Sequence, residues 1–235
     1  KYLPADEYLS GNVREKLEWA RRSAELYPED YSENVRALEA VQPVDLTASE
    51  ISVRLGATWL PPEIAEQFMF ELFGTPRYCQ WNIHVHFSQY TGEWNVEGKS
   101  YDRTNVKAYN TYGTSRINGY KIMEETLNLK DVRIFDYIED ENGKKTAVLN
   151  KKETAIAQGK QELIKQAFAD WIWQDPERRE KLTRLYNEKF NSTRPREYDG
   201  SHMSFVGINP EITLRPHQVN AIAHILYGGN TLLAH

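Results

Sequence analysis

The sequence predicts an α+β fold in which a helical hairpin and short β-hairpins pack with several amphipathic helices. Two patterns carry this prediction. Apolar residues recur every three or four positions through several stretches, which indicates helices with one buried face. In two other stretches, apolar and polar residues alternate on either side of a turn signal, which is typical of a β-hairpin. A last helix and a short apolar strand are predicted at the C-terminus.

Residues 10–41 are predicted to form the helical hairpin. Ser10 is the expected cap of the first helix and Ser32 of the second, while Pro28 separates the two and Pro43 stops the second. Apolar residues at helical spacing line both helices: Val13, Leu17, Ala20 and Ala24, then Val35, Leu38 and Val41.

A strand and a helix are predicted next. Residues 51–60 open with alternating apolar residues, which suggests a strand. Pro61 and Pro62 then begin a helix, because proline is tolerated where the first N–H has no helical partner, and Gly74 is its expected C-cap. The buried stripe of this helix is Ile64, Phe68, Met69, Leu72 and Phe73.

Two β-hairpins flank another predicted helix. The first has a turn at Thr91-Gly92, and its apolar face is Trp81, Ile83, Val85, Phe87, Trp94 and Val96. The helix begins near Thr114 and carries Ile117, Tyr120, Met123 and Leu127. The second hairpin pairs residues 132–138 with 146–149 through an Asn142-Gly143 turn of the type that favours two-residue hairpins.

The remaining chain is predicted to be mostly helical. Residues 151–173 read as a long helix whose inner side is Ile156, Leu163, Phe168, Trp171 and Ile172. Asp175-Pro176-Glu177 is a clear helix start, with Leu182, Leu185, Tyr186 and Phe190 along that helix. Residues 191–213 look irregular. Arg215-Pro216 opens a last helix with Val219, Ile222, Ile225 and Leu226, Gly228-Gly229 ends it, and residues 231–234 look like a buried strand.

Composition bounds the class of protein. With 235 residues, 40% hydrophobic and 27% charged, the chain has the makeup of an ordinary globular protein. Its one cysteine, Cys79, allows no internal disulfide, and no apolar stretch approaches a membrane span, so a cytoplasmic protein without membrane contact is expected. The first 50 residues hold the whole net charge of −5, which leaves room for a local basic face elsewhere.

The stretch 178–196 is the candidate basic face. It contains seven cations against Glu180 and Glu188: Arg178, Arg179, Lys181, Arg184, Lys189, Arg194 and Arg196. Such a face could follow the phosphate backbone of DNA. The alternative is a solvated helix face with ion pairs.

A pair of histidines is the one candidate metal site. His84 and His86 lie on one face of a predicted strand, and a His-x-His pair can bind zinc when further ligands are near. The loose candidates for those ligands are Cys79, His202 and Asp102. The alternative is the polar, exposed face of a hairpin. The sequence contains no complete catalytic motif or phosphate loop, so no self-sufficient active site is predicted.

The segment from Ile212 to Ile222, ITLRPHQVNAI, resembles the entry to superfamily-2, remodeller-like helicases. In that family a short strand follows and runs into the Gly-x-Gly-Lys-Thr phosphate loop, and here the chain ends at His235 within the matching stretch. The resemblance implies that Gln218 is the adenine-reading glutamine of an ATP site and that Arg215 belongs to the same ATP-binding motif. ATP and Mg would then be cofactors of a longer parent protein, with none in this piece.

Three further stretches, YLSGNVREKL from Tyr8, VRLGATW from Val53 and NTYGT from Asn110, resemble a large bacterial family carried on phages and conjugative elements. Its members join an adenine-specific DNA methylase to a helicase-like ATPase. The resemblance implies a helical hairpin at 1–45, an α+β connector or DNA-engaging domain at 46–190, and a linker with a truncated ATPase start at 191–235. The expected partners are DNA and the methylase and helicase modules. A purely structural packing module and a metal-dependent enzyme using His84 and His86 are the alternatives.

Overall fold

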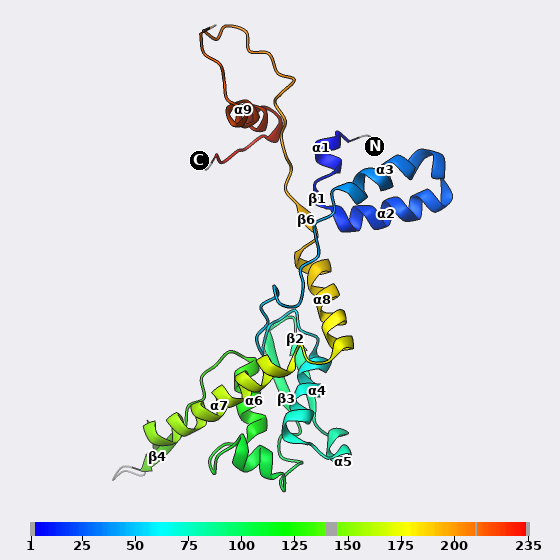
Figure 1. The fold of residues 1–235 in the computed structure, drawn as a ribbon. Helices are drawn as coiled ribbons and strands as arrows, with labels where there is room; N and C mark the ends of the chain where they lie inside the picture. Colours follow the sequence, from blue (N-terminus) through cyan, green and yellow to red (C-terminus); the bar gives the residue numbers. More distant parts are fainter. Residues whose placement is uncertain (1–2, 140–144, 210, 234–235) are drawn as a thin grey trace. The chain divides into compact units, whose positions relative to one another are not determined.

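A computed structural model describes residues 3–139, 145–209 and 211–233, and these form an α+β fold (Figure 1). Within them lie ten helices and three two-stranded antiparallel sheets, which confirms the predicted class. Contacts group the chain into two compact units: residues 1–46 with 186–235, and residues 47–185. No helix in the described ranges is long and apolar enough to cross a membrane.

The first unit contains the predicted helical hairpin, α2 (Val13–Leu26) and α3 (Pro28–Ala40), whose shared core is Val13, Leu17, Ala20 and Leu38. Both predicted caps are wrong. Asn12 caps α2, because its Oδ1 accepts the Glu15 N–H at 3.1 Å, whereas Ser10 is buried and bonds back to the Glu7 carbonyl. Ser32 lies inside α3, which begins at Pro28 as a first-turn proline.

The rest of the first unit is small. The helix α1 spans Ala5–Tyr8, and β1 (Gly11–Asn12) pairs antiparallel with β6 (Thr193–Arg194), a strand inside the stretch predicted to be irregular. The helix α9 (Pro216–Gly228) begins and ends where predicted, but residues 231–233 form no strand, and residue 234 lies outside the described part.

The second unit begins with an irregular segment rather than the strand predicted at 51–60. Its alternating apolar residues are buried, yet they bend through two successive turns, in which Ala57 N–H bonds to Arg54 O and Leu60 N–H to Ala57 O. Gly56 has a φ of +90°, and a Cβ there would lie 2.2 Å from the Leu127 carbonyl oxygen. The segment is therefore shaped by close packing against α6 (Gly119–Leu127).

The helix α4 (Pro62–Phe73) follows as predicted, with Gly74 in the left-handed conformation at its C-cap. After the short α5 (Arg77–Gln80), β2 (His84–Ser88) pairs with β3 (Glu93–Glu97). Val85, Trp94 and Val96 point into the core. Trp81 was wrongly placed on this apolar face: it precedes the strand and is 82% exposed.

Boundaries differ elsewhere in the second unit. A π-helical turn, η1 (Lys107–Thr111), precedes α6, which starts at Gly119 rather than near Thr114 because Asn118 caps it. In the second hairpin β4 (Phe135–Glu139) pairs with β5 (Lys145–Leu149), and the predicted Asn142-Gly143 turn lies outside the described residues.

The long helix α7 (Lys151–Trp171) exists as predicted, but its buried face is different. Ile156 and Leu163, placed inside by the sequence argument, are 42% and 52% exposed. The buried positions are Thr154, Ala157, Gln161, Ile164 and Phe168, which also follow helical spacing. Two of them, Thr154 and Gln161, are polar, and they are buried because their side chains bond to the backbone of residues 130–134. Their polarity hid the true buried face from a prediction based on apolar spacing.

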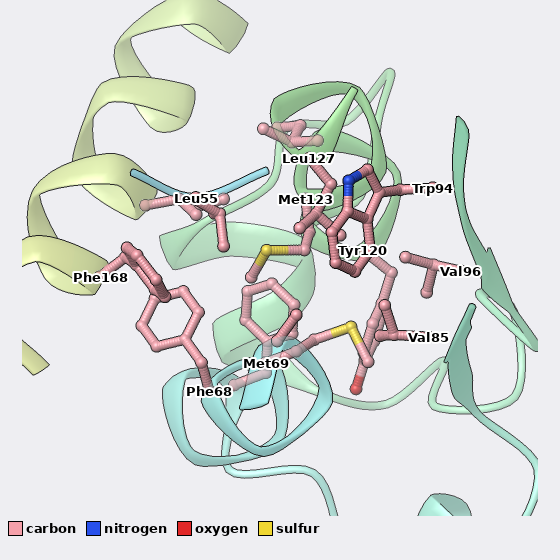
Figure 2. Close-up of a cluster of buried hydrophobic side chains, with 14 of the residues drawn as sticks. Leu55, Phe68, Met69, Val85, Trp94, Val96, Tyr120, Met123, Leu127 and Phe168 are labelled. Atoms are coloured by element: carbon pink, nitrogen blue, oxygen red, sulfur yellow. The ribbon is translucent and has the colours of Figure 1, made fainter. Parts of the chain in front are cut away.

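One core holds the second unit together (Figure 2). Side chains from α4, the β2–β3 hairpin, α6 and α7 point toward one another in the close-up, and Leu55 adds to them from the irregular segment. Phe68 of α4 and Phe168 of α7 meet edge to face, with ring centroids 5.1 Å apart. This core packs α7 against the segment around Leu55. It therefore also determines which exposed residues of α7 and of that segment lie side by side.

Candidate nucleic-acid interface

The first arginine of the predicted basic stretch is part of the fold. The helix α8 (Pro176–Phe190) starts where predicted, with Asp175 Oδ1 accepting the Arg178 N–H at 2.7 Å. The Arg178 guanidinium donates to the carbonyls of Ile172 and Trp171 and lies 3.5 Å from the Trp171 ring centroid. Arg178 is only 7% exposed, and burial lowers its pKa. Its donors hold the start of α8, so they are not available to a phosphate.

The next three cations of α8 are exposed. Arg179, Lys181 and Arg184 form no ion pair with any residue that the structure describes. By helical spacing, however, Glu177 lies one turn before Lys181 and Glu188 one turn after Arg184. The face is therefore mixed in charge rather than purely basic.

The last three cations belong to the other compact unit. Lys189 is exposed, whereas Arg194 pairs with Glu197 at 3.2 Å and Arg196 pairs with Asp6 at 2.7 Å. The hydrogen bond from Arg196 holds the pKa of Asp6 below its usual value. Arg194 and Arg196 thus serve the first unit's own structure, and the seven predicted cations do not form one set within either unit.

A different group of cations meets at a cavity of about 370 Å³ in the second unit. Arg54 comes from the irregular segment, Lys130 from the turn after α6, and Lys165 from α7, and Asp131 is the one acid among the residues that line the cavity. The apolar part of the lining is Val53, Leu55, Leu129, Phe168 and Ala169. These cations stand far apart in the sequence, and no motif there indicates that they meet.

The partners of these cations leave them open to a ligand. Lys130 has only a long contact to Glu93, 3.8 Å, and Lys165 pairs with Glu162 across one turn of an exposed helix face. Arg54 makes no ion pair with the residues in the described ranges. Exposed pairs of this kind contribute little stability, so exchanging them for a phosphate contact costs little.

The turn beside this cavity is held by four hydrogen bonds. It closes α6 with the two bonds of a Schellman motif, Lys130 N–H to Glu125 O at 2.9 Å and Leu129 N–H to Thr126 O at 3.0 Å. Gln161 of α7 also bonds to this turn and the residues after it. Its Nε2 donates to Lys130 O at 2.8 Å, and its Oε1 accepts the Val132 N–H at 3.2 Å. The cavity wall is therefore preformed.

The predicted histidine pair lies on β2, but each ring has a different carboxylate. His84 Nδ1 is 3.4 Å from Glu66 Oε2, and His86 Nε2 is 3.6 Å from Glu97 Oε2. In the described ranges no group of three or more His, Cys, Asp or Glu side chains could hold a metal ion. His202, one proposed further ligand, belongs to the other unit.

Cys79 and Asp102 belong instead to a buried polar cluster. Tyr120 donates its hydroxyl proton to Asp102 Oδ2 at 2.8 Å, and Asn105 Nδ2 donates to the same oxygen. Burial, reinforced by the Asp102 carboxylate, raises the pKa of the Cys79 thiol. A thiol held protonated is a poor nucleophile, so this cluster supports the fold rather than covalent chemistry.

The residues assigned to an ATP site by resemblance lie at the start of α9. Gln218 Oε1 accepts the Arg215 N–H at 2.9 Å, so the amide caps this helix. Its role toward adenine stays a prediction.

A family model described as "Domain of unknown function (DUF8437)" matches residues 54–192, more than half of the chain. The chain belongs to this family. The DUF8437 region contains Arg54, Lys130 and Lys165 together with the whole of α8. No curated protein and no solved structure matches the chain.

Proposed function

We propose that this chain is a non-catalytic, DNA-engaging connector of a larger DNA-processing protein. By the sequence resemblance, that protein joins an adenine-specific methylase to a superfamily-2 helicase, and ATP and Mg belong to its ATPase. The observation that carries the proposal is the cavity whose lining contains Arg54, Lys130 and Lys165 but only one acid, Asp131. Three cations around one depression, in a chain of net charge −5, favour an anionic ligand at this place.

The chemistry of the lining cations supports DNA among anionic ligands. Arginine offers a planar fork to phosphate oxygens and lysine a mobile point charge, and both are common in phosphate contacts. The exposed cations of α8, Arg179, Lys181 and Arg184, add positive charge in the same unit, although their acidic neighbours weaken that field. The cavity is therefore the primary contact in this proposal and α8 a secondary one.

The non-catalytic part of the proposal rests on how the ionisable groups are used. Among the buried ones, Glu124 accepts the Val96 N–H, and Asp102 Oδ2 accepts from Tyr120 and Asn105, while Asp102 Oδ1 has no hydrogen-bond partner among the described residues. The Cys79 thiol is held protonated. His84 is half-buried and His86 is exposed, and each lies beside a carboxylate. Orienting the methylase and ATPase on DNA would need binding but no chemistry here.

Binding to fluorescently labelled short duplex and single-stranded DNA tests the proposal. We expect the chain to bind at low salt, and the triple variant Arg54→Ala, Lys130→Ala, Lys165→Ala to bind at least tenfold more weakly, because each lost contact is charge-assisted. The matched control replaces Lys145, Lys151 and Lys152 by alanine. These three lysines are not among the residues that line the cavity, so this variant should bind within about twofold of the unchanged chain. Equal loss in both variants, or no binding at low salt, contradicts the proposal.

A packing module without DNA contact is the second candidate. Ile225 and Leu226 on α9, together with Leu232 and Leu233 beyond it, are 40% to 89% exposed, and apolar surface of this kind favours contact with another protein surface. The absence of DNA binding at every salt concentration would favour this candidate.

A further inference from the structure

Leu129 occupies a backbone position that suits glycine. Its φ is +57°, the one positive value among the non-glycine residues that the structure describes. It stands at the left-handed position of the Schellman motif after α6, where a side chain places its Cβ close to the following carbonyl oxygen. The backbone is therefore strained at Leu129, and a glycine at this position would relieve the strain.

The Leu129 side chain is 56% exposed, so it contributes little to core packing that could offset this strain. It lies instead on the lining of the cavity that also contains Arg54, Lys130 and Lys165. Strain at an exposed apolar residue beside a cluster of cations indicates a binding role, because local strain persists where a site needs the geometry.

The two uncharged polar side chains in the cavity lining, Gln161 and Thr126, already have hydrogen-bond partners inside the fold. The Gln161 Oε1 accepts the Val132 N–H, and its Nε2 donates to Lys130 O and Thr126 Oγ1. Thr126 Oγ1 in turn donates to Ile122 O. The Gln161 and Thr126 side chains are therefore poorly placed to read the hydrogen-bonding edge of a base. What the lining offers a ligand is three cations, the Asp131 carboxylate and apolar contact, and apolar contact does not depend on which base is bound.

Size and access narrow the ligand further. A volume of about 370 Å³ falls within the range of roughly 300–1,000 Å³ that sites for drug-sized ligands occupy. One nucleotide is such a ligand, whereas a duplex keeps its bases stacked and paired and exposes only its backbone and the edges of its bases. The apolar wall of the cavity can contact the face of an unpaired base, whereas a base that is paired and stacked in a duplex presents no free face to it.

We propose that this cavity binds one unpaired nucleotide of a DNA strand. Its phosphate contacts Arg54, Lys130 and Lys165, and its base packs against Leu129 and the apolar lining, without preference for base identity. This inference rests on the proposed DNA-engaging function and adds the form of DNA that is held. A free nucleotide carries the same phosphate and base, so the test must separate the two sources.

The deciding variant is Leu129→Gly, because it removes the apolar contact while relieving the backbone strain. We expect its melting temperature to equal or exceed that of the unchanged chain, and its affinity for a labelled single-stranded oligothymidine to fall by roughly fivefold to tenfold. Leu163→Ala, which truncates another exposed leucine of the same unit, should leave that affinity unchanged. Single strands should outcompete duplex, and oligothymidine and oligoadenine should bind alike.

Each opposing result has a distinct meaning. Full single-strand affinity in Leu129→Gly, or equal competition by duplex, overturns the unpaired-nucleotide inference and leaves DNA engagement standing. Binding of free thymidine monophosphate with no binding of any strand, lost in Leu129→Gly, overturns the DNA source and with it the proposed function. No binding of strand, duplex or free nucleotide overturns both.

Discussion

Neighbouring arginines with the same sequence signal do different work in this protein. Arg178 and Arg179 both belong to the basic stretch that predicts a phosphate-binding face. Only Arg179 is exposed, while Arg178 bridges the last carbonyls of α7 and stacks on Trp171. Residue type alone cannot separate the two, because the difference depends on which side of α8 meets α7.

A pair of alanine variants measures this difference. Arg178→Ala leaves two buried carbonyls without their donor and removes the cation–π contact, so the free energy of unfolding should fall by about 2–3 kcal/mol. Arg179→Ala alters an exposed position and should stay within about 0.5 kcal/mol. Urea denaturation of both variants gives the comparison, and equal losses would contradict the structural role of Arg178.

The segment before α4 is the element whose conformation depends most on a single glycine. Gly56 approaches the end of α6 so closely that an added Cβ would lie 2.2 Å from Leu127 O. Gly92, in the β2–β3 turn, also has a positive φ, but an added Cβ there meets nothing within 4 Å. The two glycines therefore separate backbone strain from steric collision.

Thermal unfolding of Gly56→Ala and Gly92→Ala tests this reading. Gly92→Ala should lose about 1 kcal/mol, the cost of a left-handed alanine. Gly56→Ala adds a collision with a backbone oxygen that cannot move freely, so it should lose at least about 2 kcal/mol more. Similar losses in the two variants would show that the segment is not packed against α6 as described.

Glu124 joins β3 to α6 from inside the second unit. Its Oε2 accepts the Val96 N–H at 2.9 Å, and its carboxylate pairs with Lys99 and Lys121. Burial raises the pKa of Glu124, but the bonds from Lys121, Lys99 and Val96 together outweigh burial and leave the pKa below the usual 4.5. The charged form is thus favoured by folding.

The sign of the pH effect follows from that lowered pKa. The contribution of Glu124 is complete above pH 4.5 and disappears as the pH falls through the lower folded value. The stability lost in Glu124→Gln should therefore be large at neutral pH and shrink in acid. Melting curves across this range test it, with the exposed Glu162→Gln as control. A loss that grows on acidification would contradict the assignment.

Elements with local signals were predictable from the sequence, and those shaped by distant contacts were not. Pro61-Pro62 and Gly74 marked both ends of α4, and Asp175-Pro176 marked the start of α8. The segment at 51–60 failed because Gly56 turns the chain against α6, which alternation cannot reveal. The face of α7 failed because Gln161 is buried for its bonds to the 130–132 backbone.

At the scale of the whole molecule, the candidate site depends entirely on the fold. Arg54, Lys130 and Lys165 lie on three separate segments, and only the core around Phe168 and Leu55 brings those segments to one cavity. The sequence instead predicts a basic face at residues 178–196, where positive charges cluster along the chain. A single sequence records clustering along the chain but not clustering in space, and for that reason the cavity was missed.

The measurement that tests the central claim most directly is the salt dependence of single-stranded DNA binding. Log affinity should fall linearly with log salt, by about 0.7 for each phosphate contact. If Arg54, Lys130 and Lys165 together neutralise one phosphate, the triple alanine variant should show a slope shallower by about 0.7, while the control at Lys145, Lys151 and Lys152 keeps the original slope. Equal slopes in both variants would contradict a phosphate-binding cavity.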